Sequence, residues 1–177
     1  MTPTPSKRLI VVTGFESSGS VFLAKIVSHV TGKCRDFGDW KGYGWNGAPG
    51  DAVVVAHRSL PYNRPRMWLP DLRAELAPYC EYQTSYVICT RDLSISQLSR
   101  QRRFGGTPTQ FAHDNATAKA AFADLLDKED CFIFSYETAV ALQEVYYQRF
   151  YRWLGVASGF APPVFDGNAP YIGPPRS

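Results

Sequence analysis

The sequence has few of the features that mark several common protein classes. Its four cysteines include no C-x-x-C pair, so neither a zinc site nor a disulfide framework is predicted. The first apolar run, RLIVVT, is much shorter than a signal peptide or a membrane-spanning helix requires. A net charge of +3 without a long basic run gives no electrostatic reason to expect nucleic acid. We therefore expect a cytoplasmic protein that binds neither membrane nor nucleic acid.

What the sequence does contain is enough apolar material for one core. Over 177 residues it is 45% hydrophobic and 14% aromatic, which fits a single domain. Short apolar runs alternate with helical patterns, and such alternation favours an α/β fold with a central parallel sheet flanked by helices. The predicted strands lie near residues 9–13, 52–56, 85–90 and 131–135, and the predicted helices near 19–31, 67–77, 93–103, 114–127 and 138–154. We expect a core over about 9–155 and an extended, proline-rich tail over 161–177.

The segment GFESSGSVFLAK, residues 14–25, lies where the first strand turns into the first helix. Its two glycines have the spacing of the phosphate-binding pattern G-x-x-x-x-G-K-[ST], but Ser20 and Val21 stand where that pattern has lysine and a magnesium-binding hydroxyl. Backbone N–H groups at a helix N-terminus bind anions without lysine, so the loop still predicts an anion site with no metal. A serine-rich turn that only caps the helix is the alternative. The candidate anion ligands are Ser17, Ser18, Gly19 and Ser20.

Two further strands end in residues suited to the same edge of the sheet. The run VVVAH ends in His57, an imidazole placed for proton transfer near neutral pH. The run YVICT is followed by Arg91, and Ser99 comes eight residues later. An arginine and a hydroxyl that converge there would suit a phosphate monoester, because guanidinium forms paired contacts with phosphate oxygens. Taken singly, each motif also fits a packing or helix-start role.

In combination and in this order, the motifs resemble the sulfotransferases that use 3′-phosphoadenosine-5′-phosphosulfate (PAPS). The family's loop P-K-S-G-T-T is similar to ESSGSV, residues 16–21, and its K-T-H-L-P segment resembles VAH, residues 55–57, with Leu60-Pro61 slightly displaced. Its R-[DN]-P segment with a later serine is similar to Arg91, Asp92 and Ser99. The late strand and Y-E pair resemble FIFSYE, residues 132–137.

The resemblance implies a three-layer, P-loop-like α/β fold and a transferase that moves a sulfuryl group from PAPS to a hydroxyl or amine. The loop residues 17–20 would hold the 5′-phosphosulfate, Arg91 and Ser99 the 3′-phosphate, and His57 would be the general base. Adenosine 3′,5′-bisphosphate would be the nucleotide product, and a small molecule or glycan the acceptor.

Two family lysines are absent, since Ser17 and Val55 stand at their positions. Arg58 is the nearest candidate for the missing charge, provided that the strand has ended by Ala56, because neighbouring residues on a strand point to opposite faces. Two other classes stay open. One is a magnesium-dependent small-molecule or nucleoside kinase with an altered loop, and the other is a nucleotide-binding protein without catalysis.

Overall fold

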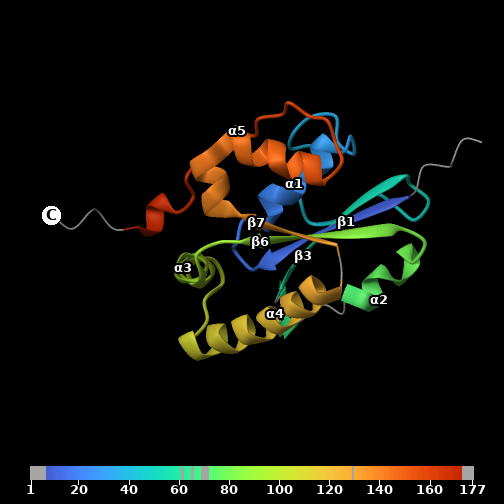
Figure 1. Cartoon of the computed structure of the whole chain (residues 1–177). Coiled ribbons are helices and arrows are strands. Elements are labelled where there is room, and N and C mark those ends of the chain that lie inside the picture. The colour runs from blue at the N-terminus through green and yellow to red at the C-terminus, as the bar shows by residue number, and fades with distance from the viewer. Residues whose placement is uncertain (1–6, 61, 65, 69–71, 129, 173–177) are drawn as a thin grey trace, which may run out of the picture.

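The computed structural model describes residues 7–60, 62–64, 66–68, 72–128 and 130–172. They form an α/β fold in which helices cover both faces of a five-stranded sheet (Figure 1). The strands of the sheet are β1 (Arg8–Phe15), β2 (Gly44–Asn46), β3 (Val53–Leu60), β6 (Gln83–Thr90) and β7 (Cys131–Ser135), and β4 (Tyr62–Arg64) pairs separately with β5 (Arg66–Trp68). The helices are α1 (Ser20–Val30), α2 (Leu72–Leu76), α3 (Leu93–Phe104), α4 (Pro108–Lys128) and α5 (Tyr136–Trp153), with short 3-10 helices η1 (Ala77–Tyr79) and η2 (Ala169–Tyr171).

The strand order of the sheet is β2-β3-β1-β6-β7. Strands β3, β1, β6 and β7 run parallel to one another, and β2 pairs antiparallel with β3 at one edge. The sheet is therefore mixed, whereas the sequence predicted a parallel one. In β1, Val12 lies opposite His57 of β3 and Val87 of β6, so these strands end together at one edge. In open α/β sheets that edge is the usual place for a ligand.

The core lies on both faces of the sheet because the central strands are apolar at nearly every position. Ile10 and Val12 of β1 pack with α1 and α5 on one face. Leu9 and Val11, which alternate with them, pack with Tyr79 and other side chains on the opposite face. Strands covered on both faces have continuous apolar runs of this kind. The two faces can be followed in Figure 1, with α1 and α5 above the sheet and α2 and α4 below it.

Several elements differ from the prediction, among them β2, α2 and α4. Strand β2 lies within residues 36–50, which have no strand periodicity; it is held by backbone pairing to β3, and Trp45 stacks on Tyr79 with ring centroids 4.7 Å apart. The helix predicted near 67–77 is shorter, because residues 66–68 form β5 and pairing overrides local helical preference. Helix α4 starts earlier than predicted, at Pro108, a residue well suited to a first helical position.

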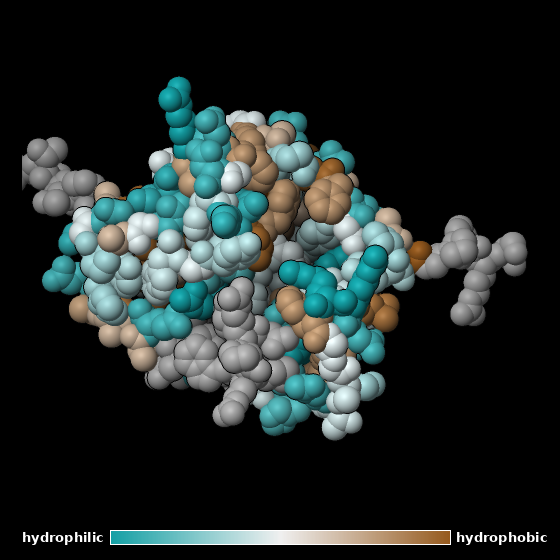
Figure 2. Space-filling model, turned by 180° about the vertical axis from the view of Figure 1, so that it is seen from behind, coloured by the Kyte–Doolittle hydropathy of each residue, from teal (hydrophilic) through white to brown (hydrophobic). Residues whose placement is uncertain are grey.

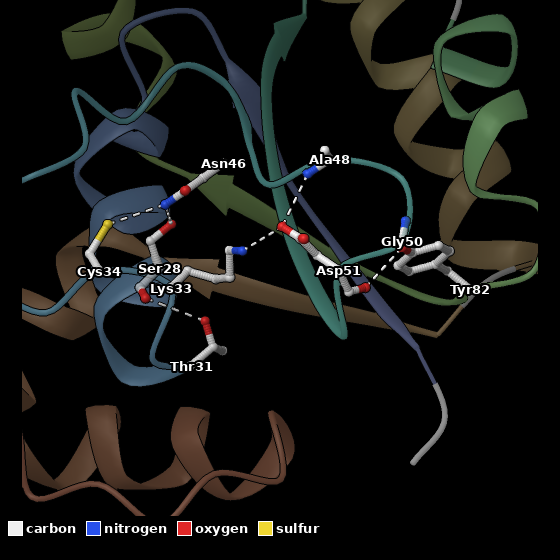
Figure 3. A network of polar contacts seen from close by, with 9 residues as sticks. All are labelled: Ser28, Thr31, Lys33, Cys34, Asn46, Ala48, Gly50, Asp51 and Tyr82. Carbon is white, nitrogen blue, oxygen red and sulfur yellow. Dashed lines mark hydrogen bonds and ion pairs between the residues drawn. The ribbon is translucent and has the colours of Figure 1, made fainter. Parts of the chain in front are cut away.

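A network of polar contacts fixes the segment between α1 and β3 (Figure 3). Lys33 Nζ lies 2.8 Å from Asp51 Oδ2, and Asn46 Nδ2 donates to Ser28 Oγ over 3.1 Å. Tyr82, before β6, donates to the Asp51 carbonyl over 2.8 Å. These contacts join the segment to α1 and to the chain before β6, so the segment is anchored at both ends.

Viewed from behind, the surface is mostly hydrophilic, with hydrophobic side chains gathered around a central hollow (Figure 2). Among the described residues, none of the helices combines the length and the apolar character needed to cross a membrane.

Candidate functional site

The loop between β1 and α1 depends on two residues with left-handed backbone. Ser17 has φ of 66° and Gly19 has φ of 94°, and a positive φ is uncommon for a residue other than glycine. A Cβ at position 19 would also lie 3.0 Å from the Tyr136 ring, so both conformation and space favour glycine there. Helix α1 begins directly afterwards at Ser20. The unpaired N–H groups of its first turn and the helix dipole favour a negative ligand at this point.

His57 lies in β3 with its ring buried beside the start of α1. Its Nε2 is 2.9 Å from Ser20 Oγ, which in turn is 3.4 Å from Ser59 Oγ. Burial, and after it the positive charge of Arg58, lower the pKa of His57 from 6.5 to about 4. The imidazole is therefore neutral at neutral pH, and a neutral ring nitrogen can accept a proton.

We expect the free energy of unfolding to fall as the pH drops from about 6.5 to about 4, because of His57. Above this range the imidazole is neutral in both the folded and the unfolded chain, so it contributes no pH dependence. Within the range the unfolded chain takes up a proton that the folded chain does not, which favours unfolding. Denaturant titrations over this range should show a flatter profile for His57→Gln than for wild type. The exposed His113, replaced in the same way, is the control, and an unchanged slope in His57→Gln would contradict the assignment.

Six of the eight predicted site residues line one cavity of about 360 Å³, hereafter the polar cavity. They are Ser17, Gly19, Ser20, His57, Arg91 and Ser99. The β1–α1 loop with the first residue of α1, β3, the residue after β6, and α3 supply them, so residues far apart in sequence meet at the edge where the parallel strands end. Of the described residues that line this cavity, Arg91 and Arg103 are the positively charged ones.

Ser18 and Arg58 do not line the cavity, although the sequence placed both in the site. Ser18, in the loop itself, is fully buried. The condition set for Arg58 is not met, because β3 continues to Leu60 and successive side chains alternate across it. Arg58 instead pairs with Glu75 at 2.7 Å. The expectation that Arg58 supplies the missing charge is thus wrong in its geometry, and Pro61 of the related segment lies outside the described residues.

Arg91 is held by the C-terminal segment, which the sequence predicted to lie extended on the surface. Its Nε donates to Asn168 Oδ1 and its Nη2 to the Gly167 carbonyl, each over 2.6 Å, while Nη1 donates to the Ser17 carbonyl over 2.9 Å. The guanidinium also contacts the Tyr136 ring, with 5.1 Å to its centroid. The tail therefore belongs to the site.

A second cavity of about 220 Å³, hereafter the apolar cavity, adjoins the first. Both cavities are lined by Gly19, Arg91 and Ser99, so they meet at these residues. The aromatic residues that line the apolar cavity are Phe22, Phe134, Tyr136, Tyr147, Phe165 and Tyr171. None of these six was named as a site residue from the sequence. For the tail residues Phe165 and Tyr171 the only local signal is their aromatic character in a proline- and glycine-rich segment.

A buried cluster of charged side chains, Glu16, Arg100 and Asp114, lies next to the β1–α1 loop. Arg100 lies 3.0 Å from a Glu16 carboxylate oxygen and 2.8 Å from an Asp114 oxygen, and its guanidinium lies over the Phe111 ring. Burial raises the pKa of Glu16 although the nearby Arg100 acts to lower it. The cluster joins the β1–α1 loop to α3 and α4, and Glu16 also lines the polar cavity.

In the part of the chain that the structure describes, no three His, Cys, Asp or Glu side chains gather as a metal site. No family model and no curated protein matches the chain. The site is therefore interpreted from its own chemistry: a helix start whose dipole favours an anion, a buried neutral imidazole, an arginine with a hydroxyl, and an adjoining aromatic cavity.

Proposed function

We propose that the protein is a cytoplasmic sulfotransferase with a P-loop-like core, which moves a sulfuryl group from PAPS to a hydroxyl or amine of a small-molecule or glycan acceptor. The observation that carries this proposal is the meeting of the loop, His57, Arg91 and Ser99 in one cavity. These are the residues on which the family resemblance rests, and they come from four separate segments.

At the phosphosulfate end, the N–H groups of residues 17–20 and the start of α1 supply donors for anionic oxygens. A transferring sulfuryl group carries less negative charge than a phosphoryl group, so backbone donors and one arginine can suffice for it without Mg²⁺. Arg103 also lines the polar cavity, so it can supply a cation there in place of Arg58.

At the nucleoside end, Arg91 and Ser99 lie at the border of the two cavities. A phosphate bound there leaves the attached nucleoside facing the apolar cavity. Aromatic side chains such as Phe22 and Phe165 suit a planar base, because rings stack favourably on one another.

For the chemistry, His57 accepts the proton of the acceptor through Nε2 while the acceptor oxygen or nitrogen forms a bond to sulfur. The bond between sulfur and the bridging oxygen of the 5′-phosphate breaks, and adenosine 3′,5′-bisphosphate leaves with that electron pair. Ser20 Oγ, now 2.9 Å from Nε2, marks the direction from which a hydroxyl can donate to the ring.

The test of this proposal is nucleotide choice. We expect adenosine 3′,5′-bisphosphate to bind in metal-free buffer more tightly than AMP, and Mg²⁺–ATP to bind weakly. Arg91→Ala should weaken bisphosphate binding about ten- to a hundredfold, the scale of a charge-assisted hydrogen bond, and should leave AMP nearly unaffected. Isothermal titration of both proteins with the three ligands measures this.

Arg102→Ala is the matched control, since it removes the same charge from an exposed position of α3 that lines neither cavity. Equal wild-type affinity for bisphosphate and AMP would contradict the proposal, and tighter binding of Mg²⁺–ATP would favour the kinase alternative. Selective bisphosphate binding without transfer to any acceptor would favour a non-catalytic nucleotide-binding protein. That second candidate is supported by the absence of both family lysines.

A further inference from the structure

Arg91 has a paired set of contacts with the tail that resembles the contact of an arginine with a phosphate. Nε and Nη2 lie on one edge of the guanidinium, and this edge is the one with which arginine often grips two oxygens of an anion. Here the two oxygens are Asn168 Oδ1 and the Gly167 carbonyl, each 2.6 Å away. Two neutral oxygens of the chain itself thus occupy the fork that would hold a phosphate.

The tail is fixed in this place by contacts beyond Arg91. Asn168 is 7% exposed, and its Nδ2 donates to Glu137 Oε1 over 3.0 Å. The Tyr136 hydroxyl donates to the Phe165 carbonyl and accepts from the Gly167 N–H, each over 3.0 Å. These contacts join the tail to Arg91, directly after β6, and to the first turn of α5, so the tail lies against the residue at which the two cavities meet.

The tail can leave without disturbing the sheet. Its described residues after α5 pair with none of the described strands, and its short helix η2 has three residues. A phosphate carries negative charge where the tail offers neutral oxygens, so it adds a Coulombic attraction to the guanidinium that the tail contacts lack. An anion can therefore replace the tail at Arg91, but it must compete with a segment tethered close by.

The geometry points to a tail that occludes the site: Gly167 and Asn168 act as an internal substitute for phosphate, and an anionic ligand gains Arg91 only by displacing them. For a nucleotide this inference rests on the proposed function, whereas for inorganic phosphate it rests on the Arg91 contacts alone. The apparent affinity for the ligand is reduced by the fraction of molecules in which the tail is closed.

Substitution of Asn168 tests the inference. Asn168→Ala and Asn168→Leu both remove the oxygen that Arg91 Nε contacts, and leucine keeps the volume of the side chain. Each variant should bind adenosine 3′,5′-bisphosphate about three- to tenfold more tightly than wild type in titration calorimetry, because competition by the tail is weaker. Ile172→Ala, at a position 60% exposed in the same tail, should bind as wild type does. Weaker binding by both Asn168 variants would overturn the inference, since Asn168 would then be orienting Arg91 for the ligand.

Hydrogen exchange of the tail separates this inference from the proposed function. Saturating bisphosphate should speed exchange of the Gly167, Tyr171 and Ile172 amides, which are hydrogen-bonded in the closed tail. If bisphosphate binds neither wild type nor the Asn168 variants, the nucleotide proposal fails, and inorganic phosphate becomes the probe. Faster exchange with phosphate in wild type but not in Arg91→Ala would then still support occlusion. Unchanged or slower exchange of these amides with a bound anion would overturn it.

Discussion

Replacing His57 with alanine is expected to lower the rate of sulfuryl transfer by about 10²–10⁴-fold, the usual contribution of a general base. The affinity for adenosine 3′,5′-bisphosphate should change little, because the anion donors come from the loop, α1 and Arg91. Single-turnover release of bisphosphate from PAPS, with an acceptor found by screening, measures the rate. Titration calorimetry with the bisphosphate measures the affinity.

The physical reason lies in the surroundings of the ring. Burial keeps the pKa of His57 at about 4, so the imidazole is unprotonated when an acceptor arrives. A bound anionic donor next to the ring favours its protonated form and thus raises that pKa, which makes the ring a stronger base when it is needed. Ser20 Oγ is 2.9 Å from Nε2, close enough for an acceptor hydroxyl in a similar position to donate to it.

His113→Ala is the matched control for this experiment, since His113 is exposed on α4 and lines neither cavity. Both variants should unfold cooperatively, which would show that a lower transfer rate does not result from loss of the folded structure. If His57→Ala kept full turnover with a good acceptor, His57 would not be the base. If it lost bisphosphate binding together with turnover, the role of the ring would be to shape the loop through Ser20.

The positions at which the apolar runs end were enough to predict that His57 and Arg91 lie at the same edge of the sheet. His57 and Arg91 each come at or just after the end of an apolar run, and parallel strands end at a shared edge. The loop at Gly19 could be placed for the same reason, because it connects the first such strand to a helix. This part of the site depends on local patterns, and local patterns are visible in a sequence.

The role expected of Arg58 failed because it depended on the exact end of a strand. The apolar run stops at Ala56, yet β3 continues through polar residues to Leu60, since its backbone pairs with β1 over eight positions. Strand ends are set by such pairing with a neighbour as well as by composition. Because β3 includes both His57 and Arg58, and successive side chains of a strand point to opposite faces of the sheet, Arg58 points away from the face of His57.

The tail could not be predicted because its contacts are entirely tertiary. Arg91 and Asn168 are 77 positions apart, and no local pattern marks an asparagine that will accept from a distant guanidinium. The same holds for the ion cluster at the loop. Arg100 stands close to Arg102 and Arg103 in the sequence, a pattern typical of an exposed basic helix face, whereas it is 4% exposed and lies between two carboxylates.

Arg100→Ala is expected to lower the free energy of unfolding by about 3–5 kcal/mol at neutral pH. Breaking a buried ion pair leaves a charge without compensation, and here two carboxylates, Glu16 and Asp114, lose their shared partner. Arg102→Ala removes an equal charge from an exposed position of α3 and should change stability by less than about 0.5 kcal/mol. Urea unfolding of the three proteins at matched pH measures the difference.

The pH dependence of this loss identifies its cause. Burial already raises the pKa of Glu16 from 4.5, and removal of the nearby Arg100 charge raises it further. A carboxyl whose pKa is higher in the folded chain contributes to the free energy of unfolding in full below its unfolded pKa. This contribution is lost as the pH rises through its folded pKa, because the folded chain must then bury a charge. The penalty of Arg100→Ala should therefore be larger at pH 7 than at pH 4.5, because a carboxyl whose pKa lies above 4.5 is mostly protonated at that pH. The double variant Arg100→Ala with Glu16→Gln should recover part of the stability at pH 7 and lose this dependence. An equal penalty at both pH values would instead assign the loss to the packing of Arg100 against Phe111.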